Sequence, residues 1–210
     1  MADLSFIYGT MESGKTTKLL QDNYNYCKHG HKVVIVKPQI DTKGGDSVVN
    51  RINNSAKVNF MIGPKDSFLD KKHLKAIDGA KVILADEAQF FTPIQIEELW
   101  EIAHIFDIQV ICYGLKTDFR GIPFEGTTAL FGYADHKTEL TVKCECGDVA
   151  NFNARLVNQK FTRDGDIVAI DGEQNVSYVP FCSDCYVKYV LAGEKVQELL
   201  QRKRLAKEEK

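Results

Sequence analysis

Residues 9–16 combine the residue types that hold a phosphate chain. Gly9 and Gly14 enclose four residues and are followed by Lys15 and Thr16, which matches the pattern G-x-x-x-x-G-K-[ST] at every defined position. The four enclosed residues are Thr10, Met11, Glu12 and Ser13. Glycines let successive backbone N–H groups face an anion, and a helix beginning near Lys15 directs its positive end toward it. A nucleoside triphosphate is the expected ligand, with Lys15 on the β- and γ-phosphates and Thr16 on Mg²⁺; a chance glycine-rich turn is the alternative.

Two carboxylates follow an apolar segment farther along the chain. Residues 81–85 have the composition of a buried strand, and Asp86 and Glu87 come directly after it. In open α/β sheets, ligands bind at the carboxyl ends of the strands. Asp86 therefore fits the carboxylate that helps to hold Mg²⁺, and a surface acidic pair is the alternative.

Six cysteines divide into two isolated residues and two close pairs. Cys144 and Cys146 form one pair, and Cys182 and Cys185 form the other. Four thiolates on two turns close a tetrahedral zinc site, and four protein ligands leave no open position for catalysis, so we expect a structural Zn²⁺. One residue separates Cys144 from Cys146 where two are usual, which predicts a tight first turn. We expect the isolated residues, Cys27 and Cys112, to be small buried hydrophobes.

These side chains need an α/β framework to hold them. The apolar runs at 32–36 and 81–85 are typical of parallel strands buried on both faces, and residues 58–62 and 108–113 predict two further strands. Helical spacing of apolar residues predicts helices over 15–29, 68–77 and 94–106, the first ending at Gly30. In the last helix we expect six residues to pack in the core: Ile94, Ile96, Leu99, Trp100, Ala103 and Ile105.

Two connections have compositions that suit a binding site. Residues 39–57 are polar and rich in glycine and predict a mobile loop, in which Asp41, Lys43 and Arg51 are candidates to face phosphates; a solvated surface loop is the alternative. Residues 114–124 are aromatic but irregular. They suit the wall of a pocket for a flat ligand, or equally a loop fixed by core phenylalanines.

The composition changes near residue 137, which predicts three parts: a nucleotide-binding domain over 1–136, a zinc-ribbon domain over 137–192 and a helical tail over 193–210. In the second part, residues 139–143 and 150–161 are strand-like, and residues 162–180 form a long segment tethered by the cysteines, which we interpret as a functional flap. We expect residues 186–210 to be helical, with a solvated charged end.

The overall composition excludes several protein classes. The chain has 210 residues, a formal net charge of -2 and a pI near 6.2, which argues against a dedicated binder of nucleic acid or of anionic membranes. No run approaches the length of a membrane span, and the N-terminus has no basic region or long apolar run. We therefore expect a cytoplasmic protein with no membrane partner.

Three blocks in this order and spacing resemble a known enzyme family. The phosphate loop, residues 86–91 (Asp-Glu-Ala-Gln-Phe-Phe) and residues 114–126 (Gly-Leu-Lys-Thr-Asp-Phe-Arg-Gly-Ile-Pro-Phe-Glu-Gly), together with the four cysteines, resemble the zinc-containing thymidine kinases of bacteria and animal cytosol. The resemblance implies a RecA-like P-loop core, a zinc ribbon whose long loop, the lasso, covers the nucleoside, and a homotetramer. It implies transfer of the ATP γ-phosphate to the 5′-hydroxyl of thymidine, and of deoxyuridine, in nucleotide salvage for DNA synthesis.

The resemblance also assigns roles to single residues. Glu87 is the expected general base, and Arg155 matches a lasso-domain arginine that acts near the phosphates. The residues expected on ATP are Gly9, Thr10, Met11, Glu12, Ser13, Gly14, Lys15, Thr16, Asp86 and Gln89. The residues expected on the thymine base are Met11, Phe90, Leu115, Phe119, Phe124 and Tyr178, with lasso backbone from Val168, Ala169, Ile170, Asp171 and Gly172.

The chain departs from the family pattern at three places. Thr10 and Glu12 replace the usual Pro and Phe, so a carboxylate at the loop's rim either weakens phosphate binding or faces solvent. Residues 170–172 read Ile-Asp-Gly where Ile-Gly-Gly is usual, and Lys43 replaces an arginine. Two other functions remain open: a nucleic-acid-stimulated P-loop ATPase with a zinc ribbon, and a regulatory nucleotide-binding module without turnover.

Overall fold

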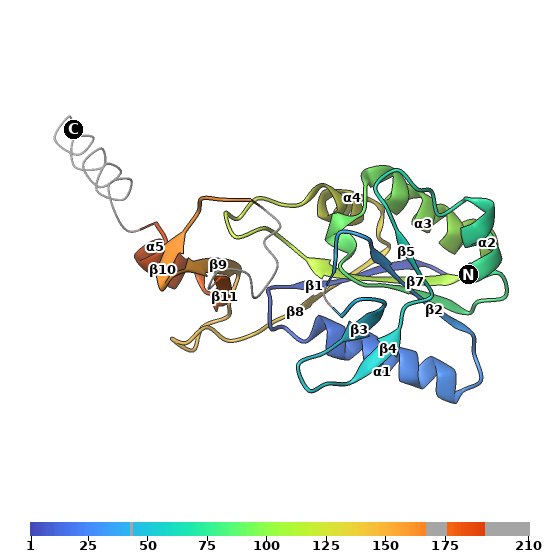
Figure 1. Ribbon diagram of the computed structural model, residues 1–210, viewed down its shortest axis with the longest axis horizontal. Coiled ribbons are helices and arrows are strands. Elements are labelled where there is room, and N and C mark those ends of the chain that lie inside the picture. Colours follow the sequence, from blue (N-terminus) through green and yellow to red (C-terminus); the bar gives the residue numbers. More distant parts are fainter. Residues whose placement is uncertain (43, 167–175, 192–210) are drawn as a thin grey trace.

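The computed structural model describes residues 1–42, 44–166 and 176–191. A six-stranded sheet with its helices forms one end of the elongated molecule, and a three-stranded sheet forms the other (Figure 1). Residues 141–151 connect the larger sheet to the smaller one, and residues 116–124, a loop of the larger unit, contact the smaller unit through hydrogen bonds. The described chain is therefore organised as two packed units with a junction between them.

The larger sheet is wholly parallel, in the order β5-β2-β6-β7-β1-β8. Its strands are β1 (Leu4–Gly9), β2 (Val33–Pro38), β5 (Phe60–Ile62), β6 (Val82–Ala85), β7 (Gln109–Leu115) and β8 (His136–Leu140). Its inner strands are buried on both faces, as the apolar runs predict. The parallel sheet flanked by helices confirms the predicted α/β fold class.

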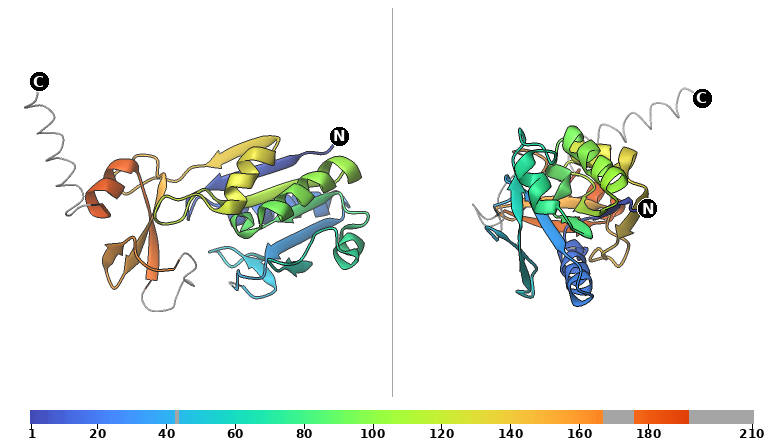
Figure 2. Two further views of the ribbon diagram at one scale, coloured as in Figure 1. Left: turned by 90° about the horizontal axis from the view of Figure 1, so that it is seen from above. Right: turned by 90° about the vertical axis from the view of Figure 1, so that its right-hand side faces the viewer.

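Helices cover the two faces of this sheet. The helices are α1 (Lys15–Lys28), α2 (Lys71–Ile77), α3 (Pro93–Phe106) and α4 (Glu125–Tyr133), with a short 3-10 turn, η1 (Ala88–Phe90). Helix α1 lies on one face, and α3 and α4 lie together on the other (Figure 2). A separate hydrophobic cluster fills each interface, one around Leu19 and one around Leu99. The sheet thus rests between two apolar layers, and its strand ends are held rigidly.

Local signals explain where the helices begin and end. Gly30 adopts a left-handed φ of 75°, and its N–H donates to the Cys27 carbonyl, which ends α1 as predicted. Thr92 and Gln95 form a reciprocal capping box at the start of α3. The prediction that Ile94 and Ile105 pack in the core is wrong, because both project from α3 into solvent and are 68% and 70% exposed.

Residues 44–57, part of the segment that the sequence predicts as a mobile loop over 39–57, have regular secondary structure. They contain an antiparallel hairpin of β3 (Ser47–Val49) and β4 (Ser55–Lys57), which packs beside α1. Val48 anchors the hairpin in the apolar cluster around Leu19. Alternation of one buried residue with exposed neighbours is too short a signal to distinguish such a strand from a loop.

Strand β8 (His136–Leu140) includes residue 137, at which the sequence predicts the boundary between the first two parts. Strand β8 pairs with β1 from Ser5–His136 to Gly9–Leu140, so these residues belong to the parallel sheet. Residues 136–139 are all exposed, because β8 is an edge strand, so this strand lacks the continuous apolar run that identified the inner strands.

The smaller sheet has the order β10-β9-β11 and is antiparallel. Its elements are β9 (Phe152–Val157), β10 (Lys160–Thr162), β11 (Val176–Phe181) and the helix α5 (Ser183–Tyr189). Asn158 and Gln159 join β9 to β10 with φ values of 48° and 63°, as a two-residue hairpin turn requires. The predicted helical tail over 193–210 lies outside the described residues.

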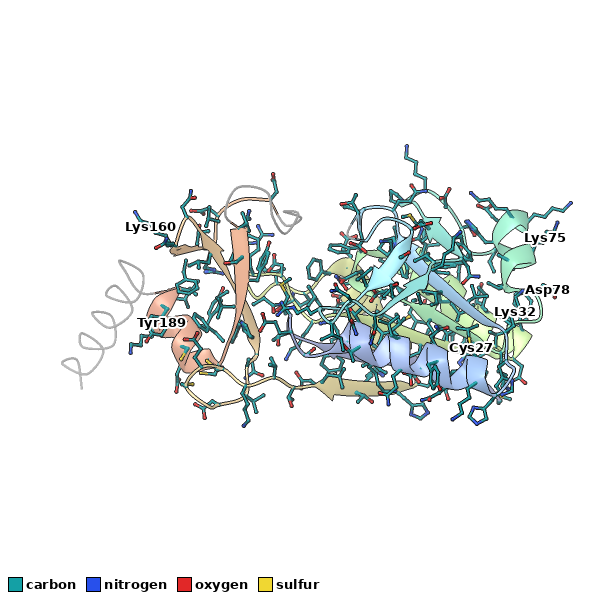
Figure 3. The ribbon with its side chains drawn as sticks, turned by 60° about the horizontal axis from the view of Figure 1, so that its bottom comes forward. Cys27, Lys32, Lys75, Asp78, Lys160 and Tyr189 are labelled. Carbon is teal, nitrogen blue, oxygen red and sulfur yellow. The ribbon has the colours of Figure 1, made fainter. Side chains whose placement is uncertain are left out.

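Figure 3 labels residues near the two ends of the described part of the molecule. Lys160 and Tyr189 mark one end, and Cys27, Lys32, Lys75 and Asp78 mark the other (Figure 3). Cys27 is exposed, so the prediction that it is buried is wrong, whereas Cys112 is buried as predicted. Among the described helices, none has the length and apolarity needed to cross a bilayer.

Candidate active site

A cavity of about 420 Å³ opens where the carboxyl ends of the parallel strands face the smaller sheet. It is lined by twelve of the residues that the sequence nominated for ATP or thymidine. They are Met11, Glu12, Gly14, Lys15, Thr16, Glu87, Gln89, Phe90, Leu115, Phe119, Phe124 and Tyr178. Gly9, Thr10, Ser13 and Asp86 lie beside it in the same segments but are not lining residues. Residues 168–172 lie outside the described residues.

The phosphate loop connects β1 to α1 as its sequence predicts. Gly14 has a left-handed φ of 86°, which a glycine tolerates without strain. The buried Lys15 ammonium donates to the carbonyls of Thr10 (2.7 Å) and Gly9 (3.5 Å). Burial lowers the pKa of Lys15, while Glu87 and Asp86 oppose that shift. A cation thus sits inside the loop, close to two acidic groups.

The acidic pair follows β6 at the same sheet edge. Asp86 is buried, and its pKa is raised to about 8 by burial, by the charge of Glu87 and by that of Asp41. Glu87 is half-buried and has a left-handed φ of 47°, an uncommon backbone for glutamate. Non-glycine residues in this region often mark functional sites.

Gln89 holds the Glu87 side chain in position. Its Nε2 donates to Glu87 Oε2 at 2.5 Å, and its Oε1 accepts from the Leu115 N–H at 3.0 Å. This bridge joins the ends of β6 and β7. Gly114 is needed here, because a Cβ at that position would lie 2.8 Å from Gln89 Oε1 and 3.1 Å from Gln89 N.

Aromatic side chains form another part of the cavity wall. Phe90 and Phe124 meet edge to face with ring centroids 5.4 Å apart. Phe119 is buried, and the guanidinium of Arg155 lies 5.0 Å from its ring centroid. Such a surface suits a flat, partly apolar ligand. Residues 114–124 therefore combine the two alternatives drawn from sequence, because these phenylalanines pack internally and also line the cavity.

Asn153 of β9 connects the two units at this cavity. Its Oδ1 accepts from the Met11 N–H at 2.7 Å, and its Nδ2 donates to the Thr117 carbonyl at 3.3 Å. Tyr186 adds a second connection, since its hydroxyl donates to the Phe119 carbonyl at 2.6 Å. The smaller sheet thus fixes both the phosphate loop and the aromatic segment.

Arg155 makes contacts different from those implied by the resemblance. Its Nη1 donates to the carbonyls of Asp164 (3.4 Å) and Asp166 (3.0 Å), at the start of the predicted lasso. Among the described lining residues of the cavity, Arg155 is absent, whereas Asp41 and Arg51 are present. Lys43 lies outside the described residues.

The comparisons with known proteins agree with this geometry. A sequence model of the family "Thymidine kinase" matches residues 2–186. This chain belongs to the thymidine kinase family. The thymidine kinase of Rhodopirellula baltica is 39% identical over 183 residues, which cover 85% of this chain and 86% of that protein. The thymidine kinase of Mannheimia succiniciproducens is 38% identical over 188 residues, covering 87% and 93%.

Solved structures give only a weak similarity. The AMPPCP-bound DnaA from Aquifex aeolicus has a TM-score of 0.41 and 15% identity, covering 67% of this chain and 41% of that one. Values this low carry no argument about function, so the family assignment of this thymidine kinase family member rests on sequence.

The four paired cysteines come together as predicted. Their sulfur atoms all lie within 4.8 Å of one another, and the Sγ atoms of Cys146 and Cys182 are 3.5 Å apart. Burial acts to raise the pKa of Cys144, but hydrogen bonds from the backbone of Cys146 and Cys182 lower this pKa to about 7. In this member of the thymidine kinase family the cluster has the composition and spacing of a zinc site.

Sequence reasoning missed eight lining residues, which are Thr17, Ile40, Thr42, Val49, Asn50, Thr117, Asp118 and Asn153. Extending each nominated motif by one residue finds five of them, Thr17, Ile40, Thr42, Asn50 and Asp118. Asn153 has no such signal, because it reaches the cavity only through the packing of β9 against the phosphate loop.

Proposed function

We propose that this chain is an ATP-dependent thymidine kinase that transfers the γ-phosphate of ATP to the 5′-hydroxyl of thymidine, and of deoxyuridine, for nucleotide salvage. One observation carries the proposal besides family membership: a single cavity is lined by Lys15 and Thr16, by Glu87 and by the aromatic wall. A phosphate grip, a carboxylate and a surface for a flat base in one cavity are what this transfer requires.

The residues around the cavity have different roles in the proposed phosphate transfer. The phosphate loop binds and orients the phosphates, and Lys15 supplies positive charge to the oxygens that become more negative during transfer. Glu87 accepts the proton of the attacking hydroxyl, while Gln89 keeps its carboxylate oriented. A general base of this kind typically contributes about 10²–10⁴ in rate.

Thr16 and Asp86 are the proposed holders of Mg²⁺. A hydroxyl and a carboxylate are hard oxygen donors of the kind that Mg²⁺ prefers. Burial of Asp86 beside Glu87 and Asp41 disfavours its ionised form, and a divalent cation at this site would favour that form. When bound, Mg²⁺ neutralises charge on the phosphate oxygens.

The cysteine cluster is the proposed site of a structural Zn²⁺. Tetrahedral Zn–S bonds of about 2.3 Å separate sulfur atoms by about 3.8 Å, which agrees with the observed cluster. The ion would tie the turn at Cys144 to the start of α5 and so stabilise the sheet that carries Asn153 and Tyr178.

The remaining parts of the proposal depend on the resemblance. They are base recognition by the lasso backbone over 168–172, stacking of Tyr178 on the base, a homotetramer, and a cytoplasmic location without nucleic-acid partners. Tyr178 lines the cavity, which supports its role. The nucleic-acid-stimulated ATPase is not favoured, because the family assignment and the enclosed aromatic wall both support a nucleoside acceptor.

The deciding experiment measures ADP release from ATP and Mg²⁺ by zinc-loaded protein, with thymidine, with other nucleosides and with single-stranded DNA. We expect thymidine and deoxyuridine to stimulate release and DNA to have no effect. Stimulation by DNA alone would support the ATPase, and nucleotide binding without turnover would support a regulatory module.

A further inference from the structure

The phosphate loop of this chain has an acidic residue on the wall of the cavity. Glu12 lines the cavity together with Lys15 and Thr16. Its backbone is left-handed, with a φ of 68°, so its placement follows from the loop's own turn. A carboxylate here repels a triphosphate, because like charges a few ångströms apart disfavour one another. Something must offset this charge if the loop is to hold ATP.

Arg51 supplies the opposite charge. Its Nη1 lies 2.7 Å from Glu12 Oε1, although the two residues are 39 positions apart in sequence. Arg51 lines the same cavity, so the ion pair lies at the ligand site. The pair therefore faces the ligand and not only bulk water.

The hairpin that carries Arg51 is fixed against α1. Asn50 is buried, and its Nδ2 donates to Thr17 Oγ1 at 3.3 Å. Its Oδ1 accepts from the N–H groups of Ile52 (3.2 Å) and Asn54 (2.9 Å), which shapes the turn around Arg51. The turn thus rests on the first turn of α1, next to the phosphate loop.

We propose that Arg51 is a positioning residue for nucleoside triphosphate binding that acts through Glu12. It neutralises the Glu12 carboxylate and holds the β3–β4 hairpin at the phosphate loop, so that this altered loop accepts a highly charged ligand. The proposal rests on the proposed function only in taking the ligand to be a nucleoside triphosphate.

The exposure of the two side chains predicts whether Arg51→Ala changes folding stability or ligand affinity. The side chains of Arg51 and Glu12 are 68% and 34% exposed. Exposed ion pairs contribute little to folding stability. Arg51→Ala should therefore leave the melting temperature nearly unchanged and act on ligand affinity instead.

The test is a double-mutant cycle in which the Kd of the non-hydrolysable analogue AMPPNP with Mg²⁺ is measured by calorimetry. Arg51→Ala should weaken binding about tenfold, because it leaves one carboxylate unneutralised beside the phosphates. Glu12→Gln alone should tighten binding about threefold relative to the unchanged protein. The double variant should bind less than about twofold more weakly than Glu12→Gln alone. Arg51→Lys should restore most of the affinity.

Two results would overturn the proposal. If Arg51→Ala weakens binding by the same factor in the unchanged protein and in the Glu12→Gln variant, Arg51 contacts the ligand directly. If Arg51→Ala has no effect, the pair is a surface ion pair only. Lys72→Ala is the matched control, since it breaks an exposed pair with Asp66 far from the cavity lining. Because binding is measured without thymidine, the result does not depend on whether the chain turns over as a thymidine kinase.

Discussion

The two ends of the cavity are built in opposite ways. The phosphate end comes mainly from one continuous segment, residues 9–17, and depends on backbone groups and the helix that follows. The aromatic end is assembled from Phe90, residues 115–124, Asn153 and Tyr178, which are distant in sequence and belong to both units. A contiguous motif thus serves phosphates, whereas the base surface depends on how the two units pack.

The difference predicts how each end responds to change. The phosphate end should depend less on the smaller sheet, because β1 and α1 belong to the larger unit, although the hydrogen bond from the Met11 N–H to Asn153 links the phosphate loop to β9. The aromatic end should depend more on that sheet, since it receives side chains from β9 and β11. Glu87 belongs to neither end and lies in the turn after β6, where the transfer itself is proposed.

Glu87→Gln should give the largest effect and leave both ends intact. The amide preserves shape but accepts no proton, so kcat should fall by about 10²–10⁴ while AMPPNP affinity changes by less than about threefold. Steady-state kinetics and calorimetry measure the two quantities. The control is Glu101→Gln on α3, outside the cavity lining, and undiminished turnover in Glu87→Gln would remove Glu87 as the base.

Zinc removal should weaken thymidine binding at the aromatic end much more than nucleotide binding at the phosphate end. Structural zinc contributes about 10–16 kcal/mol to the folding of small zinc domains, so a chelator or Cys182→Ser should disrupt the smaller sheet. We expect the KM for thymidine to rise about 100-fold, while the Kd of AMPPNP rises only about fivefold, through loss of the hydrogen bond between Asn153 and the phosphate loop.

The control for zinc removal is Cys27→Ser, which changes an exposed cysteine outside the cluster and should retain zinc. Zinc content is measured by a colorimetric chelator. Equal loss of affinity for both ligands would show that the ends are not independent.

Phe124→Ala should weaken only the aromatic end. Loss of the Phe124 ring, together with its edge-to-face contact with Phe90, should remove about 2 kcal/mol of contact with a base, or about 30-fold in the KM for thymidine. The KM for ATP should stay within about twofold. Phe131→Ala, an aromatic residue of α4 that lies outside the lining, is the control, and an equal change in both variants would argue against a base pocket.

Asn153→Ala should have the smallest kinetic effect, and it should change the KM values for both ATP and thymidine. It removes hydrogen bonds to the Met11 N–H and the Thr117 carbonyl, each worth about 1 kcal/mol, so the KM values for ATP and thymidine should both rise about fivefold. Asn151→Ala, a change at an exposed residue directly before β9, should leave both values unchanged. An effect confined to one ligand would contradict the link between the ends.

Much of the site was predictable because its signals are local. The loop at Gly9–Thr16, the carboxylates after β6 and the paired cysteines each depend on residues close in sequence, and the structure brings the predicted groups to one cavity or one cluster. The predictions failed where a local sequence pattern carries no information about which parts of the chain cover a residue or pair with it. Ile94 and Ile105 have helical spacing yet face solvent, and β8 lacks an apolar run yet pairs with β1.

The sequence by itself determined the phosphate loop, the acidic pair, the cysteine set and the α/β class, since backbone geometry and ligand chemistry restrict which residue types these features accept. Only the tertiary structure decided that Arg51 meets Glu12, that Asn153 joins the two units and that Arg155 holds residues 164 and 166. These contacts span from 9 to 142 positions, and each exists because two packed surfaces fit together, which no short pattern of residues encodes.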